Sequence, residues 1–134
     1  GAKLRKFGDK VKAFVEQHGT DEKMAEFITP LADIGDKVGK LSMEIGMKAF
    51  MNRDEVGGAA VPYLRVVGHL VYSYFFARMA KIALEKEKSG DDFYKAKLAT
   101  ARFYFAKLLP ETAMLIRSAR SGVKPLMEMD ESLF

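Results

Sequence analysis

The chain has 134 residues, of which 49% are hydrophobic and 30% are charged, and a formal net charge of +4. It contains no Cys, which excludes disulfide scaffolds, thiolate metal sites and Cys nucleophiles. This length and composition predict one globular domain over residues 1–134, and we expect a cytoplasmic, reducing compartment. Because the sequence begins Gly-Ala without Met, we interpret it as an excised piece of a longer protein.

The first predicted helix covers residues 2–17 and is rich in basic residues. Its apolar face recurs at three- and four-residue steps and consists of Leu4, Phe7, Val11, Phe14, Val15 and His18. The basic residues of this segment are Lys3, Arg5, Lys6, Lys10 and Lys12. Because apolar residues separate these charges at helical spacing, we interpret them as the solvated face of an amphipathic helix and not as a nucleic-acid or membrane contact.

The second helix is predicted to begin near Thr20, where Asp21 and Glu22 supply a cap and an acidic first turn. Pro30 removes a backbone donor, so we expect a kink or a helix that restarts there. The apolar seam beyond it consists of Leu31, Ile34, Val38, Leu41 and Ile45. One position further round lie the small residues Gly35, Gly39, Ser42 and Gly46. We expect a neighbouring helix to approach this strip closely, which would offset the low helix propensity of Gly.

A polar, Gly-containing break is predicted at residues 52–58. The third helix follows it, with Pro62 in the opening turn, and continues to about Lys88. Its most apolar stretch, residues 70–77, is far shorter than the roughly 20 residues that a membrane span requires. We therefore expect no membrane partner.

The fourth helix is predicted from Asp92 to about Arg120, with a kink near Lys107 caused by Pro110. Residues 126–134 are expected to form an extended tail with apolar anchors. No segment shows the alternation of a strand. Four helices joined by short loops predict an all-α fold, with a four-helix up-down-up-down bundle as its architecture.

The third and fourth helices carry more large apolar side chains than one buried stripe needs. This excess implies burial on two sides, either deep in a bundle or between the bundle and a partner. The candidate interface residues are Tyr72, Phe75, Phe76, Phe103 and Tyr104.

The residue patterns of common catalytic and metal sites are missing. Neither His18 nor His69 follows a Glu by three residues, which argues against a di-metal centre, and we expect His69 to be hydrogen-bonded in the core or at an interface. No Gly-x-Ser-x-Gly elbow and no phosphate-binding loop occurs. We therefore predict no catalytic, cofactor-binding or metal-binding residue. A cryptic enzyme that uses Glu44 or Glu111 is the remaining alternative.

Nearly the whole chain resembles a known family, most strongly from Ala60 onward. Residues 60–80 and 92–111, which include Phe-Tyr-Lys-Ala-Lys-Leu-Ala-Thr-Ala-Arg, are similar to the C-terminal extension of bacterial acyl-CoA dehydrogenases of the methylmercaptopropionyl-CoA dehydrogenase-like subgroup. Residues 116–129 follow the same pattern. The resemblance implies a parent enzyme whose core binds FAD and acyl-CoA, removes the α-proton with a carboxylate and passes hydride to the flavin. Because the core's motifs are absent here, the resemblance assigns no catalytic or cofactor residue to this chain.

The sequence thus predicts a non-catalytic helical module of an FAD-dependent acyl-CoA dehydrogenase. Its expected partners are the catalytic core of the parent enzyme and the homo-oligomer mate, and its expected role is subunit packing or shaping of the acyl-CoA entrance. The alternative is an independent binding module that takes an amphipathic segment or an apolar ligand between the third and fourth helices.

Overall fold

The computed structural model describes residues 1–51 and 53–121, with the backbone alone for residues 53–56. Every element in this part is helical, as predicted, and there are five α-helices where the sequence predicted four. They are α1 (Ala2–His18), α2 (Ala25–Met51), α3 (Arg53–Glu85), α4 (Asp92–Phe103) and α5 (Glu111–Ser121). Two 3₁₀ turns, η1 (Glu22–Met24) and η2 (Glu87–Ser89), and a π-helical turn, η3 (Tyr104–Leu108), complete the described elements.

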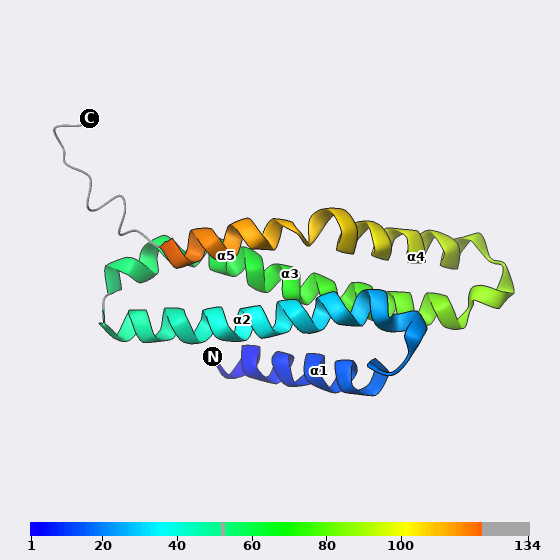
Figure 1. Cartoon of the computed structure of the whole chain (residues 1–134), viewed down its shortest axis with the longest axis horizontal. Helices are drawn as coiled ribbons and strands as arrows, with labels where there is room; N and C mark the ends of the chain where they lie inside the picture. Colours follow the sequence, from blue (N-terminus) through cyan, green and yellow to red (C-terminus); the bar gives the residue numbers. More distant parts are fainter. Residues whose placement is uncertain (52, 122–134) are drawn as a thin grey trace, which may run out of the picture.

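The helices lie side by side in an elongated array, in which α1, α2, α3 and α4 run in alternating directions and α5 continues in the direction of α4 (Figure 1). The segments α4, η3 and α5 form one arm that runs back along α3. The central helix is α3, because it packs against α2, α4 and α5, whereas α1 packs mainly against α2. The shorter α1 accompanies only the first part of α2 (Figure 1).

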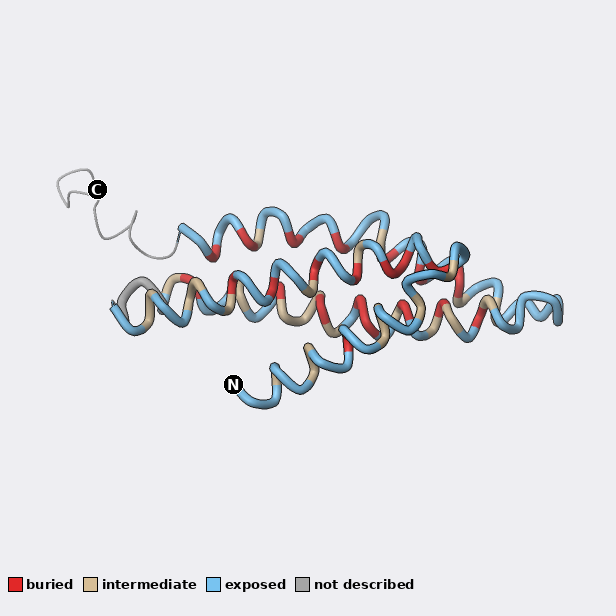
Figure 2. Tube along the Cα trace, turned by 60° about the horizontal axis from the view of Figure 1, so that its bottom comes forward, coloured by how far each residue is buried: buried red, intermediate tan, exposed pale blue. Residues whose placement is uncertain are grey.

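Buried apolar side chains from all five α-helices form one core, and Figure 2 shows these buried positions on the inward sides of the helices. The predicted seam of α2 is confirmed. Its members Leu31, Ile34, Val38 and Leu41 are buried, and Ile45 is partly buried. Each such aliphatic side chain contributes roughly 1.5–3 kcal/mol when it leaves water, so the seam is a main source of stability.

The cap predicted at Asp21 forms, and Asp91 forms a second cap at the start of α4 (Asp92–Phe103). The Asp21 side chain accepts a hydrogen bond from the Lys23 amide at 3.0 Å, and that of Asp91 accepts one from the Phe93 amide at 2.9 Å. Each bond satisfies an amide that has no partner within its own helix. Gly90 precedes the second cap with a φ of 71°, the left-handed backbone that Gly adopts without steric cost.

The helix restart predicted as one alternative at Pro30 and the break predicted before Pro62 are not observed. Pro30 lies within α2, which continues through it, and Pro62 lies within α3, which already begins at Arg53. The break predicted at residues 52–58 is therefore helical from residue 53, while residue 52 lies outside the described part. Pro30 is the sixth residue of α2 and removes few intrahelical bonds, whereas Pro62 is the tenth residue of α3 and the helix continues despite the lost bond. Packing also outweighs the propensity cost of Gly. Ala59, directly after the paired glycines, is buried.

The interruption predicted near Lys107 is confirmed, and it divides the predicted fourth helix into α4 and α5. The Leu109 amide donates to the Tyr104 carbonyl at 2.9 Å, a π-type bond that spans five residues. Pro110 follows, and it has no amide hydrogen to continue the ladder. A π turn next to a Pro inserts an extra residue and shifts the direction of the side chains beyond it.

The strip of small residues on α2 does not meet a neighbouring helix along its length. A Cβ atom on Gly35 would lie 3.7 Å from Val11 of α1 and 3.9 Å from Leu70 of α3, which is ordinary packing contact. A Cβ atom on Gly39 or Gly46 would meet no atom within 4 Å outside the local helix backbone. The predicted close approach is therefore wrong at these two positions.

Two bidentate ion pairs join α2 to the α4–α5 arm. Arg102 of α4 donates to both carboxylate oxygens of Glu26 at 2.7 and 3.1 Å, and Arg120 of α5 does the same to Glu44 at 2.8 and 3.0 Å. The two pairs sit near opposite ends of α2, so they fix the register of the arm along it.

The tail predicted at residues 126–134 lies outside the described residues. Among the helices that the structure describes, none has both the length and the apolar character needed to cross a membrane.

Candidate functional site

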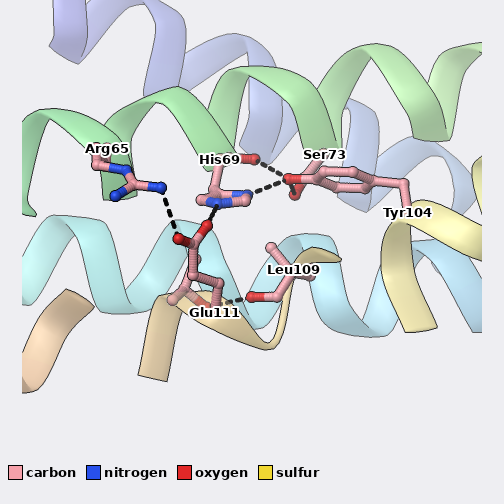
Figure 3. A network of polar contacts seen from close by, with 7 residues as sticks. Arg65, His69, Ser73, Tyr104, Leu109 and Glu111 are labelled. Atoms are coloured by element: carbon pink, nitrogen blue, oxygen red, sulfur yellow. Dashed lines mark hydrogen bonds and ion pairs between the residues drawn. The ribbon is translucent and has the colours of Figure 1, made fainter. Parts of the chain in front are cut away.

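A polar cluster joins the middle of α3 to the arm at the π turn (Figure 3). The Tyr104 hydroxyl donates to the His69 carbonyl oxygen at 3.0 Å and lies 2.8 Å from His69 Nδ1 and 3.4 Å from Ser73 Oγ. On the other side of the ring, His69 Nε2 donates to Glu111 Oε2 at 2.9 Å. Arg65 Nη2 donates to Glu111 Oε1 at 2.6 Å. We call Arg65, His69, Ser73, Tyr104 and Glu111 the clasp.

The local structure of the arm positions two members of the clasp. The π turn begins at Tyr104 and turns its ring toward α3, where Phe76 stacks on it with ring centroids 4.6 Å apart. The restart of the helix after Pro110 places Glu111 in the first turn of α5, where a carboxylate also interacts favourably with the helix dipole. Arg65, His69 and Ser73 follow one another at four-residue steps on α3 and therefore share a face.

The contacts of the clasp shift two pKa values. The hydrogen bond from His69 holds the pKa of the Glu111 carboxyl below its usual value, and the charge of Arg65 acts in the same direction. Burial raises the pKa of the Tyr104 hydroxyl to about 12, because the phenolate would lose its hydration. The lowered pKa favours the ionised Glu111 carboxylate, which accepts hydrogen bonds from His69 and Arg65. The raised pKa favours the protonated Tyr104 hydroxyl, which donates to the His69 carbonyl oxygen.

The clasp has the character of a structural element. Tyr104 is only 2% exposed, and among the described residues no buried side-chain polar atom lacks a hydrogen-bond partner. His69 is hydrogen-bonded, as predicted. Both carboxylates considered as cryptic catalytic groups are engaged in ion pairs, Glu44 with Arg120 and Glu111 with Arg65. The described residues contain no cluster of three or more His, Asp or Glu that could hold a metal ion.

The five candidate interface residues fall into two groups. Tyr72, Phe75 and Phe103 are 59%, 53% and 57% exposed. Tyr104 is buried, and Phe76 packs on it against the core, so these two side chains belong to the interior. The structure thus separates aromatics that periodicity alone does not distinguish.

The exposed aromatics of α3 belong to a longer apolar stripe. Exposed apolar side chains recur along α3 with a helical period, and Gly68 lies between them. We call the following set the α3 face: Val61, Leu64, Tyr72, Phe75 and Ile82. Positions at steps of three, four and seven residues lie on one side of a helix. Sequence reasoning missed Val61, Leu64 and Ile82. The available signal was that the apolar residues of α3 surround the helix on all sides.

Further apolar surface lies on α2. A groove of about 1090 Å³ opens between α1 and α2, and its lining includes Gly35, Gly39, Tyr63 and Leu70. The end of α2 exposes Met43, at the edge of the groove, and beyond it Met47, Phe50 and Met51. The ligand site of the alternative hypothesis was placed between the third and fourth helices, yet there Ala77, Ala80 and Ala101 are fully buried. The groove between α1 and α2 is the better location for that hypothesis.

Residues 7–130 match the family model described as "Acetyl-CoA dehydrogenase C-terminal like". The chain belongs to this family. The match begins within α1 and extends past the end of α5, so it includes the clasp and the α3 face. No curated protein matches the sequence. Membership of this family associates the chain with the catalytic core of an acyl-CoA dehydrogenase and thereby with FAD-dependent enzymes.

Proposed function

We propose that this chain is a non-catalytic helical module of an FAD-dependent acyl-CoA dehydrogenase, of the methylmercaptopropionyl-CoA dehydrogenase-like subgroup. In this proposal the α3 face packs against the catalytic core of the enzyme or against its homo-oligomer mate. The module contributes subunit packing and shapes the substrate entrance, while FAD and acyl-CoA are bound by the core. The family match supports the setting.

The observation that carries the proposal is the exposed α3 face. A central helix that is apolar on all sides is expected to be buried on all sides. Yet Tyr72 and Phe75 are more than half exposed on the side of α3 that neither α2 nor the arm covers. Burial of apolar area contributes roughly 25 cal/mol per Å², so covering this face with a partner surface gives a favourable free energy of association.

Site-specific cross-linking tests the docking role. In the full-length dehydrogenase, Phe75 is replaced by the photoreactive residue p-benzoylphenylalanine. Met114, which is 76% exposed on the side of α5 opposite its buried residues, receives the same replacement as a control. We expect cross-links from position 75 to the core or to the mate, and none from position 114. Absence of cross-links from position 75 would refute the docking role.

A second experiment tests the assignment as non-catalytic. The purified chain is assayed for bound flavin by its visible absorbance and for acyl-CoA-dependent reduction of an electron-accepting dye. We expect neither a flavin spectrum nor dye reduction. Turnover by the chain alone would show that it is an enzyme in its own right.

The α1–α2 groove supports a second candidate function, the binding of an apolar or amphipathic ligand. Its volume of about 1090 Å³ is large enough for a small ligand. The space above Gly39 is open, so Gly39→Leu is expected to fill the groove without a clash. If the groove is a ligand site, the fluorescence enhancement of a naphthalenesulfonate dye is lost in this variant. Unchanged enhancement would refute the groove as the binding site.

A further inference from the structure

The second inference rests on the proposed function and concerns the chemistry of the partner. We infer that the α3 face receives an acidic amphipathic helix, in which one apolar stripe is bordered by carboxylates on the side that faces Arg78. The shape of the face, the charges beside it and the area that it offers support this inference.

The shape of the face fits a helix. It extends along α3 from Val61 to Ile82, about 32 Å at the rise of an α-helix, and it is about one helix wide. Near its middle, a Cβ atom on Gly68 would meet no atom within 4 Å. A partner backbone can therefore approach closely at Gly68 while its side chains pack beside Leu64 and Tyr72. Helix-in-groove recognition uses anchors at this spacing.

Most charged residues beside the face on α3 are basic. Between residues 57 and 85 the charged residues are Arg65, Arg78, Lys81 and Glu85. From their helical positions, Arg65 borders the face on one edge and Arg78 borders it on the other, and both are exposed. Lys81 points away from the face, toward Asp21.

The neighbouring helices reinforce this pattern. Phe7 and Phe14 of α1 pack edge-on against the Tyr74 ring, with ring centroids 5.2 and 5.7 Å apart. The Arg78 guanidinium carbon lies 5.6 Å from the centroid of the same ring. Exposed Lys10 is three residues from Phe7 and four from Phe14, so it shares their side of α1 and continues the basic edge. Among the described residues, no carboxylate forms an ion pair with a basic residue of α1.

The nearby carboxylates on α3 and α5 already have basic partners. Glu111 binds Arg65 and His69, and Glu85 lies 3.4 Å from Lys81. Because Glu111 neutralises Arg65, the positive charge that remains for a partner lies along the other edge, where Arg78 and Lys10 are exposed. Complementary carboxylates on the partner would guide its approach and fix its register.

A second copy of the chain fits this surface poorly. In an antiparallel two-fold arrangement the same patch faces itself, so the basic edge of one copy would meet the basic edge of the other. A stripe of about 32 Å by the width of one helix offers about 300 Å², below the roughly 800 Å² per partner of a stable complex. A segment of the same enzyme does not need that area, because covalent linkage raises its effective concentration.

Two model peptides test the inference. Both are 22-residue helices with a leucine stripe, and one carries Glu and the other Lys at every flanking position. Because a free peptide lacks the covalent linkage, fluorescence anisotropy measures binding at concentrations of the full chain up to about 1 mM, the range of effective concentrations of linked segments. The measurements are made in 50 mM and 300 mM NaCl. We expect the Glu peptide to bind at least tenfold more tightly at low salt and its advantage to shrink at high salt. Equal binding, preference for the Lys peptide or binding of neither would overturn the inference.

Variants locate the binding. Arg78→Glu is expected to weaken binding of the Glu peptide at least threefold, and Phe75→Glu to abolish it. The control Met114→Glu leaves it unchanged, and circular dichroism verifies that each variant is folded. Loss of binding in Met114→Glu but not in Phe75→Glu would place the peptide elsewhere and overturn the inference. Self-association of the chain in sedimentation experiments, abolished by Phe75→Glu, would identify a second copy as the occupant and also overturn it.

The two proposals fail separately. If position 75 cross-links to the catalytic core but the two peptides bind equally, the partner is not acidic and the docking role stands. If position 75 forms no cross-link in the dehydrogenase, the docking role fails whatever the peptides do.

Discussion

Glu111 accepts a hydrogen bond from His69 at 2.9 Å, and this contact ties the first turn of α5 to the middle of α3 across 42 residues of sequence. The same carboxylate accepts a hydrogen bond from Arg65, and the same imidazole is hydrogen-bonded to the hydroxyl of the buried Tyr104. These hydrogen bonds connect the α4–α5 arm to α3 beside the helix interruption at Pro110. The clasp thus stabilises the arm where the regular helix ends.

Protonation of Glu111 is expected to weaken the clasp at low pH. The pKa of Glu111 is lowered in the folded chain, chiefly by the hydrogen bond from His69. Its contribution to the free energy of unfolding is therefore complete above the pKa of the unfolded carboxyl and is lost as pH falls through the lower folded pKa. Urea denaturation of the chain and of Glu111→Gln between pH 6 and pH 2 tests this. The difference in unfolding free energy should shrink as pH falls, and a constant difference would contradict it.

Tyr104→Phe is expected to destabilise the chain by about 1–3 kcal/mol, the typical cost of a lost hydrogen bond that leaves buried partners unsatisfied. The substitution removes the hydroxyl shared by the His69 carbonyl oxygen, His69 Nδ1 and Ser73, while the ring can remain stacked on Phe76. The matched control is Tyr72→Phe, because Tyr72 is exposed and its change should stay within about 0.5 kcal/mol. Urea denaturation at pH 7 measures both. Equal effects would show that the buried hydroxyl adds nothing.

The Tyr104 hydroxyl should also be identifiable by its ionisation. Its pKa is raised to about 12 by burial, so ultraviolet absorbance at high pH should show a phenolate transition there that Tyr104→Phe lacks. Because this pKa is raised on folding, stability is complete below the unfolded pKa and is lost as pH rises toward the folded one. A variant titration curve identical to that of the parent chain would contradict the assignment.

Much of the fold follows from local sequence signals. The seam from Leu31 to Leu41 repeats every three to four residues, and this period allows one side of a helix to be buried. The caps at Asp21 and Asp91 and the interruption at Pro110 depend on a few neighbouring atoms, so they too are readable from the sequence. Pro62 and the glycines before it were misread, because packing over a whole helix outweighs local propensities.

The candidate site was less predictable because it depends on distant contacts. His69 lies 35 residues from Tyr104 and 42 from Glu111, and no local pattern indicates that a π turn brings them together. Similarly, the surplus of aromatic residues was evident from the sequence, but the sequence does not show which of the adjacent residues Phe75 and Phe76 is exposed. Which of them faces outward depends on where α2 and the arm lie around α3.

Burial should determine how strongly aromatic truncations destabilise the chain. Phe27 of α2 is fully buried, and its ring centroid lies 5.7 Å from that of Phe105 in the arm. Phe27→Ala should therefore lower the free energy of unfolding by about 3–5 kcal/mol. Phe50, near the end of the same helix, is 93% exposed, so Phe50→Ala should stay within about 0.5 kcal/mol. Thermal and urea denaturation measure the two variants. A large loss in Phe50→Ala would mean that the end of α2 is covered in solution, for example by another copy.

The ion pair between Glu26 and Arg102 should make a small and salt-sensitive contribution. Both side chains are about half exposed, so their attraction is screened by water despite the bidentate geometry. A double-mutant cycle with Glu26→Gln and Arg102→Gln should give a coupling of about 0–1 kcal/mol that decreases in 0.5 M NaCl. The pair therefore aligns α4 with α2 more than it stabilises the fold. A coupling well above this range that persists in salt would show that the pair is shielded from solvent.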